Sequence, residues 1–315
     1  MDTLLTWWMD TRSYPRFRDE LGYAGPGFDE SIRQKTQIIL ANSHSVTHEP
    51  QPLLENVVHV GGLHIRPTKP LPPDLQAYLD SCSEGAVLVS FGSSITPSSM
   101  TDAKRREFIA AFAALNNRII WKWDTAASDD IPENVLVRNW LPQQDLLAHP
   151  NLKVFVSHGG LLSVMESVYH ETILVGIPLA NDQKPNLVRV QDKNIGIMLD
   201  WDTIDAGRLV EAINRALTDA GMAESIRQQS RLFRDRPEPP VKTAAWWIEF
   251  VLRNNGTQFL MPRSMDLSWV QAWNLDILAA GLLILSLGAL ISYKLLRFSF
   301  AFVCKCCKSQ KMKHD

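Results

Sequence analysis

The chain has 315 residues, 45% of them hydrophobic and 21% charged, which is enough for one large folded domain or two ordinary ones. The formal net charge is −2, and no basic stretch interleaved with aromatic residues occurs before the extreme C-terminus, so a small neutral or anionic molecule is a more suitable partner than nucleic acid. Three of the four cysteines crowd into residues 304–307, which leaves no disulfide framework and no set of four spaced zinc ligands. Composition therefore predicts a folded protein that uses neither disulfides nor a metal ion.

The first 66 residues are rich in turns, with two short buried strands predicted at 38–42 and 56–62. We expect residues 1–66 to be the remnant of an N-terminal domain and not a whole domain. The run of prolines that follows predicts a linker over residues 67–82.

From residue 83 to residue 255, short apolar runs alternate with segments of helical periodicity. Strands are predicted at 86–91, 118–122, 135–139, 154–157, 173–175 and 195–199, and helices at 102–115, 161–169, 185–193, 205–218 and 223–233. This alternation is typical of an α/β domain of Rossmann-like type, with a parallel sheet covered by helices on both faces. In such sheets ligands bind beyond the carboxyl ends of the strands, so we expect the ligand-binding domain here.

Two predicted strands end in residues suited to phosphate groups. The first leads into Gly92 and Ser93, where glycine lets the backbone approach a ligand closely and the hydroxyl can donate a hydrogen bond. The second ends in His158, Gly159 and Gly160 and runs into a helix, whose first N–H groups and dipole favour an anion. The alternatives are an ordinary Gly-Ser turn and a surface histidine, but the His-Gly-Gly turn favours a diphosphate.

A third strand, at 135–139, is followed by Trp140 and Gln143. An indole ring offers a flat face on which a nucleotide base can stack, and an amide at this spacing can reach a ribose. On residue type alone a tryptophan is more often part of the hydrophobic core, so this prediction depends on the resemblance given below.

An uncharged apolar stretch at 277–293, preceded by Trp269 and Trp273 and followed by lysines, predicts one membrane-spanning helix. We place this helix and its flank at 275–303, a lumenal juxtamembrane segment at 256–274 and a basic cytosolic tail at 304–315, because the basic side of a span faces the cytosol.

Two short signals agree with that topology. Asn255 opens a glycosylation sequon, and lysines third and fifth from the end resemble a retrieval signal of the endoplasmic reticulum, although an ordinary basic flank looks similar. They predict a single-pass protein of the endoplasmic reticulum membrane with its globular part in the lumen. The N-terminus has no feature of a signal peptide, so we expect the sequence to be incomplete there.

Three blocks of sequence together form a recognisable signature. They are 140–147 (WLPQQDLL), 155–160 (FVSHGG) with Glu166, and Gly176-Ile177-Pro178 with Asp182, Gln183 and Asn186. The blocks closely resemble the signature of UDP-glycosyltransferases of the glucuronosyltransferase family, and the part from 140 to 183 is highly specific. The resemblance extends over roughly residues 20–315, and the variant at 161–163 (LLS) looks like the arthropod branch.

The resemblance implies a two-domain fold of the GT-B type, with the acceptor and the catalytic histidine in the N-terminal domain and the UDP-sugar in the C-terminal one. Carried over by position, the resemblance implies that Trp140 stacks on uracil and that Gln143 and Glu166 hold the ribose hydroxyls. Ser93 and His158 contact the diphosphate, to which Gly159 and Gly160 expose the helix N-terminus. Asp182 and Gln183 bind the hydroxyls of the sugar. No catalytic residue of the family falls within this chain, and no metal or cofactor is implied.

The implied activity is that of a metal-independent, inverting hexosyltransferase of sugar conjugation and detoxification. Such an enzyme transfers glucuronic acid or glucose from a UDP-sugar to a small lipophilic acceptor, and the resemblance favours neither sugar over the other. Membrane lipid is a further expected partner. The alternative is a truncated, non-catalytic form that binds UDP-sugar and associates with full-length enzymes, as part of a homo- or hetero-oligomer.

Several positions depart from the family pattern. Leu162 stands where vertebrate members usually have asparagine, which removes one phosphate contact. Glu171 and Ile173 replace the usual glycine and proline of a turn, and Ala180-Asn181 precede Asp182 where Phe-Ala is common. These departures put the loop of the sugar pocket in question.

Overall fold

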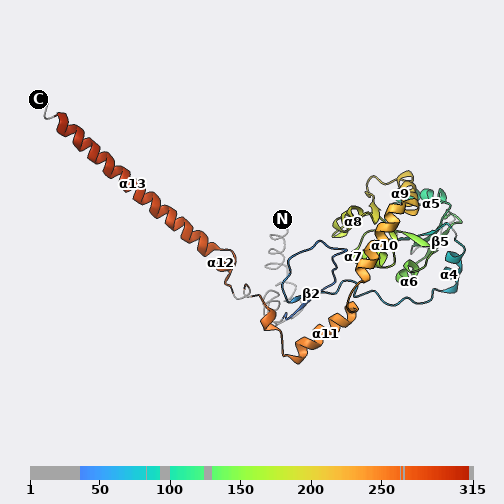
Figure 1. Cartoon of the computed structure of the whole chain (residues 1–315). Coiled ribbons are helices and arrows are strands. Elements are labelled where there is room, and N and C mark those ends of the chain that lie inside the picture. The colour runs from blue at the N-terminus through green and yellow to red at the C-terminus, as the bar shows by residue number, and fades with distance from the viewer. Residues whose placement is uncertain are drawn as a thin grey trace, which may run out of the picture. The chain divides into compact units, whose positions relative to one another are not determined.

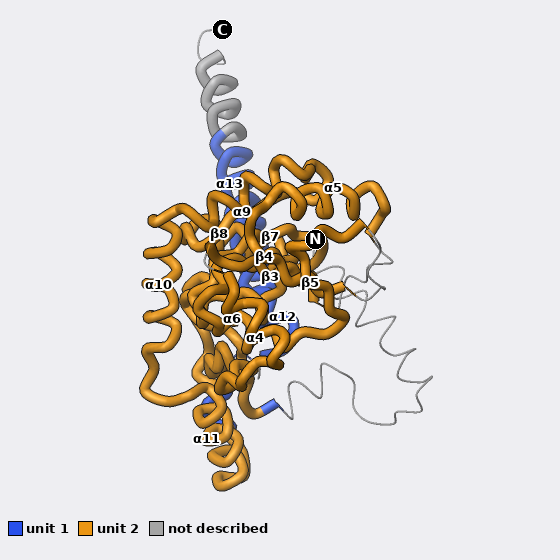
Figure 2. Tube along the Cα trace, turned by 90° about the vertical axis from the view of Figure 1, so that its right-hand side faces the viewer, with its two compact units in different colours: residues 1–36, 258–315 blue, residues 37–257 orange. Residues whose placement is uncertain are grey.

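The structure, a computed structural model, describes residues 36–82, 84–92, 100–123, 130–262, 264 and 267–311 (Figure 1). The chain divides into two compact units, one made of residues 37–257 and the other of residues 1–36 and 258–315 (Figure 2). The larger unit holds all the strands of the described chain.

A six-stranded parallel sheet forms the centre of the larger unit, with strand order β5-β4-β3-β6-β7-β8 (Figure 1). Its strands are β3 (Ala86–Ser90), β4 (Arg118–Lys122), β5 (Val135–Arg138), β6 (Leu152–Ser157), β7 (Ile173–Gly176) and β8 (Gly196–Met198). Every residue of β3 is buried, which is why Ala86 to Val89 form a continuous apolar run that does not alternate, and only the last residue, Ser90, is polar. The chain builds the sheet outward in opposite directions from β3 and β6, so the topological switch point lies between these two strands.

Eight helices of the described chain belong to this unit. They are α4 (Pro73–Asp80), α5 (Asp102–Ala113), α6 (Gln143–Leu147), α7 (Leu161–Tyr169), α8 (Gln183–Asp192), α9 (Ala206–Thr218), α10 (Ala220–Arg234) and α11 (Pro240–Arg253). Thr101, Asp205 and Asp219 begin α5, α9 and α10, and each side chain accepts a hydrogen bond from the backbone of the first turn.

The hydrophobic core lies where the helices pack on the sheet. Trp121 of β4 meets Phe112 of α5 edge to face with ring centroids 5.2 Å apart, and both side chains are fully buried. Phe155 of β6 is also fully buried at the centre of the sheet. Close packing of these rings fixes the strands and therefore the loops that leave their carboxyl ends.

The expected α/β fold with a parallel sheet is confirmed, and β4 and α7 have the predicted bounds. The prolines at 67–73 do not lead into an open linker, however, because α4 lies within residues 67–82 and buries Leu75 and Leu79. Neither α4 nor α11 was predicted from the sequence. Both begin with proline, which a helix tolerates at its first position because the N–H there has no partner within the helix.

The larger unit also contains a separate two-stranded parallel sheet of β1 (Ile39–Ala41) and β2 (Val57–His59). Both strands lie within the predicted segments and are shorter than them. The prediction that they are buried is wrong, because their residues are exposed or half-buried in this small two-stranded sheet. Residues 62–69, which lead from this small sheet toward α4, are called the connecting segment below.

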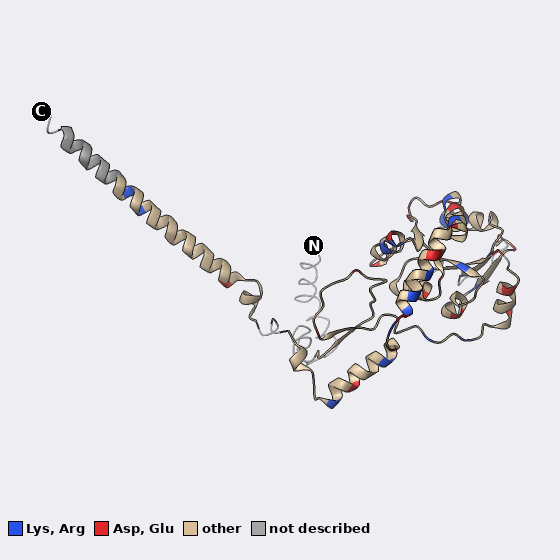
Figure 3. Ribbon diagram, viewed as in Figure 1, with Lys and Arg blue, Asp and Glu red and all other residues tan. Residues whose placement is uncertain are grey.

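In the smaller unit the described residues form η3 (Gln258–Leu260), α12 (Trp269–Ala272) and α13 (Leu275–Lys311). Leu275–Ser299 of α13 has a mean hydropathy of 2.2 and is long and apolar enough to cross a membrane. Within that stretch the charged residues are Asp276 at one end and Lys294 and Arg297 at the other, as Figure 3 shows. The helix therefore matches the predicted span, and it continues to residue 311, into the segment predicted as a tail.

Candidate functional site

Most of the predicted site residues meet at the carboxyl edge of the six-stranded sheet. Gly92 follows β3 and His158 follows β6, so these two residues flank the topological switch point. Open α/β sheets bind their ligands at this point. Ser93, the predicted phosphate contact, lies outside the described residues.

His158 is held between two glycines. A Cβ at Gly92 would lie 3.0 Å from Cε1 of His158, and one at Gly160 would lie 2.7 Å from Nε2, so larger residues at either position would displace the ring. The ring is largely buried, and its Nδ1 has no hydrogen-bond partner among the described residues. Burial lowers the pKa of His158, and the nearby carboxylate of Asp182 opposes that shift. The imidazole is therefore neutral at neutral pH, with a buried nitrogen that lacks a partner.

The turn after β6 exposes the start of α7. Gly159 has φ of +82°, which favours glycine, and a Cβ there would lie 2.4 Å from Cγ of Leu187. Gly160 is the N-cap residue of α7, and no side chain caps the helix. The first N–H groups of α7 are thus left for a ligand, as the sequence predicts for an anion.

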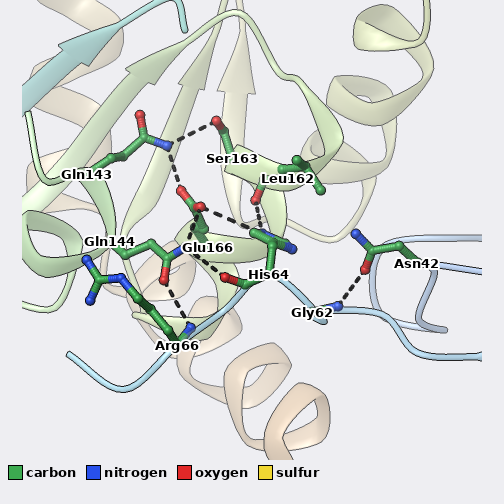
Figure 4. A network of polar contacts seen from close by, with 9 residues as sticks. All are labelled: Asn42, Gly62, His64, Arg66, Gln143, Gln144, Leu162, Ser163 and Glu166. Carbon is green, nitrogen blue, oxygen red and sulfur yellow. Dashed lines mark hydrogen bonds and ion pairs between the residues drawn. The ribbon is translucent and has the colours of Figure 1, made fainter. Parts of the chain in front are cut away.

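Glu166 of α7 is the centre of a polar network (Figure 4). Its carboxylate accepts a hydrogen bond on each oxygen, from Nε2 of Gln143 to Oε2 at 2.6 Å and from Nε2 of Gln144 to Oε1 at 3.0 Å. Nε2 of His64 lies 3.7 Å from Oε1. Gln143 also donates to Oγ of Ser163 at 3.2 Å. Although Glu166 is only 7% exposed, its charge is satisfied by amide donors that also fix its direction.

Trp140, which follows β5, projects from the same edge and is 77% exposed. Nζ of Lys122, the last residue of β4, lies 5.5 Å from the centroid of an indole ring of Trp140 and donates to the carbonyl oxygen of Gly92 at 2.9 Å. A tryptophan this exposed does not serve the core. It offers a flat surface with a cation on one face.

Asp182 and Gln183 lie at the start of α8, Asp182 as its N-cap residue and Gln183 as its first residue. Oε1 of Gln183 accepts hydrogen bonds from the N–H groups of Leu179 and Ala180 at 2.8 and 2.9 Å. Oδ2 of Asp182 accepts from Nδ2 of Asn186 at 2.9 Å, and the same amide donates to the carbonyl oxygen of Gly159 at 3.1 Å. These bonds hold the loop before α8 in shape and tie it to the glycine turn.

The structure thus brings eight predicted donor-site residues to this edge or to its adjoining helices: Trp140, Gln143, His158, Gly159, Gly160, Glu166, Asp182 and Gln183. Their roles in binding stay predictions. Sequence reasoning missed Lys122, Gln144 and His64. Two of them carried a signal in the sequence, since Lys122 ends a predicted strand and Gln144 lies within the signature block 140–147.

Asn255, the predicted glycosylation site, follows α11 and is exposed, with φ of +52°. Thr257 of the same sequon is fully buried, and its hydroxyl donates to the carbonyl oxygen of Gln37 at 2.8 Å.

Within the described ranges, no group of three or more His, Cys, Asp or Glu side chains is placed to hold a metal ion.

Comparison with known proteins adds independent evidence. The family model described as "UDP-glucoronosyl and UDP-glucosyl transferase" matches residues 7–311. UDP-glycosyltransferase UGT5 of Dactylopius coccus is 34% identical over 274 residues, which cover 87% of this chain and 52% of the relative. UDP-glucuronosyltransferase 2B7 of Homo sapiens is 32% identical over 307 residues, which cover 97% of this chain and 57% of the relative. The chain therefore spans about half the length of these curated relatives.

Solved structures agree on the fold. The glycotransferase of kitacinnamycin superposes with a TM-score of 0.59 at 21% identity, over 80% of this chain and 61% of the other. A UDP-glucosyltransferase from Polygonum tinctorium superposes with a TM-score of 0.54 at 22% identity, over 65% of this chain and 49% of the other. These likenesses confirm the GT-B-type fold. With the family model matched along almost the whole sequence, the chain belongs to the UDP-glucuronosyl and UDP-glucosyl transferase family.

Proposed function

We propose that the larger unit binds the UDP-sugar donor of a UDP-glycosyltransferase. Within a longer protein it would take part in the inverting transfer of glucuronic acid or glucose to a small lipophilic acceptor. The single observation that carries the proposal is the buried carboxylate of Glu166, which is held by two amide donors and lies on α7, the helix whose start has no side-chain cap.

The hydrogen bonds already made by Glu166 leave room for a diol. A carboxylate offers about four lone-pair positions. Gln143 and Gln144 take one position on each oxygen, so each oxygen keeps another for an incoming donor. The 2′ and 3′ hydroxyls of a ribose are two such donors on neighbouring carbons. Hydrogen bonds to a charged group contribute about 1.5–3 kcal/mol each, so this arrangement supports tight recognition of a ribonucleoside.

Trp140 supports recognition of the base. The exposed indole lies two residues after β5 and three residues before Gln143, so a base stacked on it is joined to a ribose close to Glu166. Stacking of a nucleic-acid base on an aromatic side chain is worth about 1–3 kcal/mol.

The start of α7 supports the diphosphate and the leaving group. In inverting transfer, the acceptor oxygen attacks the anomeric carbon while the bond from that carbon to the β-phosphate oxygen breaks, so negative charge grows on UDP. The free N–H groups of α7 and the neutral His158 are donors suited to that charge. The proton of the acceptor goes to a general base, which the family resemblance assigns to the acceptor-binding N-terminal domain.

The sugar and the membrane complete the proposal. Asp182 and Gln183 stand at the start of α8, which is bonded to the glycine turn through Asn186, and we assign them to the hydroxyls of the transferred sugar. Helix α13 would anchor the protein as a single-pass protein of the endoplasmic reticulum membrane, with the larger unit in the lumen. A non-catalytic form that only binds UDP-sugar would have the same donor site and would differ in turnover.

Calorimetric titration of UDP into the full chain, kept in a non-ionic detergent, tests the proposal. The chain should bind UDP, and Trp140→Ala should weaken binding by about tenfold, in keeping with the loss of one stacking contact. The matched control is Trp246→Ala, which removes a tryptophan of α11 that is 47% exposed and should leave UDP binding unchanged. A folded chain that binds no UDP would overturn the assignment.

A further inference from the structure

The side-chain amide of Gln144 makes three hydrogen bonds that join separate parts of the larger unit (Figure 4). Its Oε1 accepts from the backbone N–H of Arg66 at 3.1 Å. Its Nε2 donates to the carbonyl oxygen of His64 at 3.1 Å and to Oε1 of Glu166 at 3.0 Å. Both amide hydrogens and the amide oxygen are therefore used.

The first two of these bonds fasten the connecting segment to α6. An amide that accepts from one backbone N–H and donates to a backbone carbonyl two residues earlier repeats what a neighbouring β-strand would offer. Asp145, the next residue, adds a second fastening. Its carboxylate accepts two hydrogen bonds from the guanidinium of Arg66, at 2.9 and 2.6 Å, and one from the N–H of Lys69 at 2.7 Å. Two consecutive residues of α6 thus hold residues 64–69.

The third bond reaches the carboxylate that we assign to ribose. Because Oε1 of Glu166 accepts from Gln144, its remaining lone pair has a defined direction. The same fastening also places His64 beside Glu166, where Nε2 of the imidazole lies 3.2 Å from the carbonyl oxygen of Leu162 and 3.7 Å from Oε1 of Glu166. Nδ1 of His64 is buried and has no hydrogen-bond partner among the described residues. One amide therefore contacts both the carboxylate, whose other oxygen is held by Gln143, and the segment beside it.

We infer that Gln144 is a positioning residue that couples the connecting segment to the ribose subsite. It directs Oε1 of Glu166 at a ribose hydroxyl, and a bound ribose in turn holds the connecting segment against α6. The inference rests on the proposed function, since it takes the ligand of Glu166 to be the ribose of the donor. Coupling between two sites is reciprocal, so it has to appear both in ligand discrimination and in the motion of the segment.

Ligand discrimination gives the first readout. The full chain in detergent is titrated with UDP and with 2′,3′-dideoxy-UDP, which lacks both hydroxyls. Wild type should prefer UDP by about tenfold or more, as charge-assisted hydrogen bonds predict. In Gln144→Leu the preference should fall to about threefold or less, while affinity for the dideoxy ligand stays within about twofold of wild type because base and diphosphate contacts remain.

Hydrogen exchange gives the second readout. The N–H of Arg66 is bonded to Gln144, so UDP should slow exchange in a peptide covering residues 62–69 of the wild-type chain. The same peptide of Gln144→Leu should exchange faster and should not respond to UDP. The matched control is Gln191→Leu, because Oε1 of Gln191 accepts from the backbone N–H of Met198 at 3.4 Å and takes no part in the network of Glu166. That variant should keep both the preference for UDP and the protection of residues 62–69.

The outcomes separate the inference from the proposed function. Equal affinity of wild type for the two ligands would overturn the ribose assignment of Glu166. A wild-type preference that Gln144→Leu retains in full would overturn the coupling and leave the ribose assignment intact. If a folded Gln144→Leu chain loses its affinity for both UDP and 2′,3′-dideoxy-UDP, the amide supports the whole binding site. That result would also contradict a positioning role confined to the ribose.

Discussion

Leu187 of α8 fills the space in which the side chain of residue 159 would otherwise lie. A Cβ built on Gly159 falls 2.4 Å from Cγ of Leu187, and one built on Gly176 falls 2.1 Å from its Cδ2. The turn that exposes the start of α7 and the helix that follows the sugar loop are therefore packed through one leucine. Glycine at 159 serves this packing as well as the backbone geometry.

Gly159→Ala should destabilise the chain and weaken UDP binding. The substitution places a methyl group on Leu187 and forces a residue with a side chain to keep φ of +82°, which together should cost about 2–4 kcal/mol. Chemical denaturation measures the loss of stability. Gly207→Ala is the control, because the nearest atom to its added Cβ is Oδ1 of Asp205 at 3.4 Å and alanine favours the helix there. Equal stability of the two variants would contradict the packing argument.

Glu171 gives a prediction of the opposite sign. It follows the end of α7 with φ of +62°, at the position where a helix commonly ends in glycine and where the family usually has one. Glu171→Gly should raise the free energy of unfolding by about 1 kcal/mol, because glycine has no Cβ and adopts the left-handed conformation without steric strain. The ion pair with Arg234, at 3.8 Å between partly exposed groups, offsets little of this gain.

The control for this change is Glu171→Ala, which also removes the ion pair but keeps a Cβ in the left-handed region. Thermal unfolding of both variants should rank glycine above alanine. If alanine stabilises the chain as much as glycine does, backbone strain is not the cause.

Much of the fold follows from patterns that lie along the chain. The strand at 118–122 was predicted because Ile119, Ile120 and Trp121 form an apolar run, and all three are fully buried. Helix α4 was missed because the prolines at 67–73 indicated a linker, although proline fits the first turn of a helix. Helix α11 also begins with proline and was not predicted.

The network around Glu166 could be predicted only in part. Gln143, Gln144 and Glu166 belong to blocks of the signature, which lie close together in the sequence. His64 lies 80 residues from Gln144, and the two meet through a side-chain amide and a backbone carbonyl. No periodicity or spacing in a single sequence records such a contact. The packing of the connecting segment on α6 has to be seen in the fold.

Acid should destabilise the larger unit through His44. Burial lowers the pKa of His44 to about 4, and the positive charge of Arg236 and the neighbouring His59 and Lys193 act in the same direction. Because the pKa in the folded chain is below the unfolded value of 6.5, protons bind preferentially to the unfolded chain as the pH falls from 6.5 to 4. The contribution of His44 to the free energy of unfolding is therefore fully present above pH 6.5 and is lost as the pH falls to 4. After allowance for the partial solvent exposure of the ring, this loss is about 1–2 kcal/mol.

His44→Asn tests this effect, because Oδ1 of asparagine lies where Nδ1 accepts the hydrogen bond from the N–H of Val46, and asparagine does not titrate. The free energy of unfolding of the variant should fall less than that of wild type between pH 6.5 and pH 4. Carboxylates contribute equally to both proteins, so the difference isolates the histidine. Identical slopes would show that His44 does not titrate as its burial predicts.

The most direct test of the donor site is the affinity of Glu166→Gln for UDP, measured by calorimetry on the full chain. A glutamine at 166 faces the amide donors of Gln143 and Gln144 with one acceptor oxygen instead of two, and it lacks the charge that strengthens the bonds to ribose. The control is Glu211→Gln, which removes the same charge from an exposed position of α9. We predict that Glu166→Gln binds UDP at least about tenfold more weakly than wild type while Glu211→Gln binds normally. Equal UDP affinity of a folded Glu166→Gln chain and wild type would contradict the donor site described here.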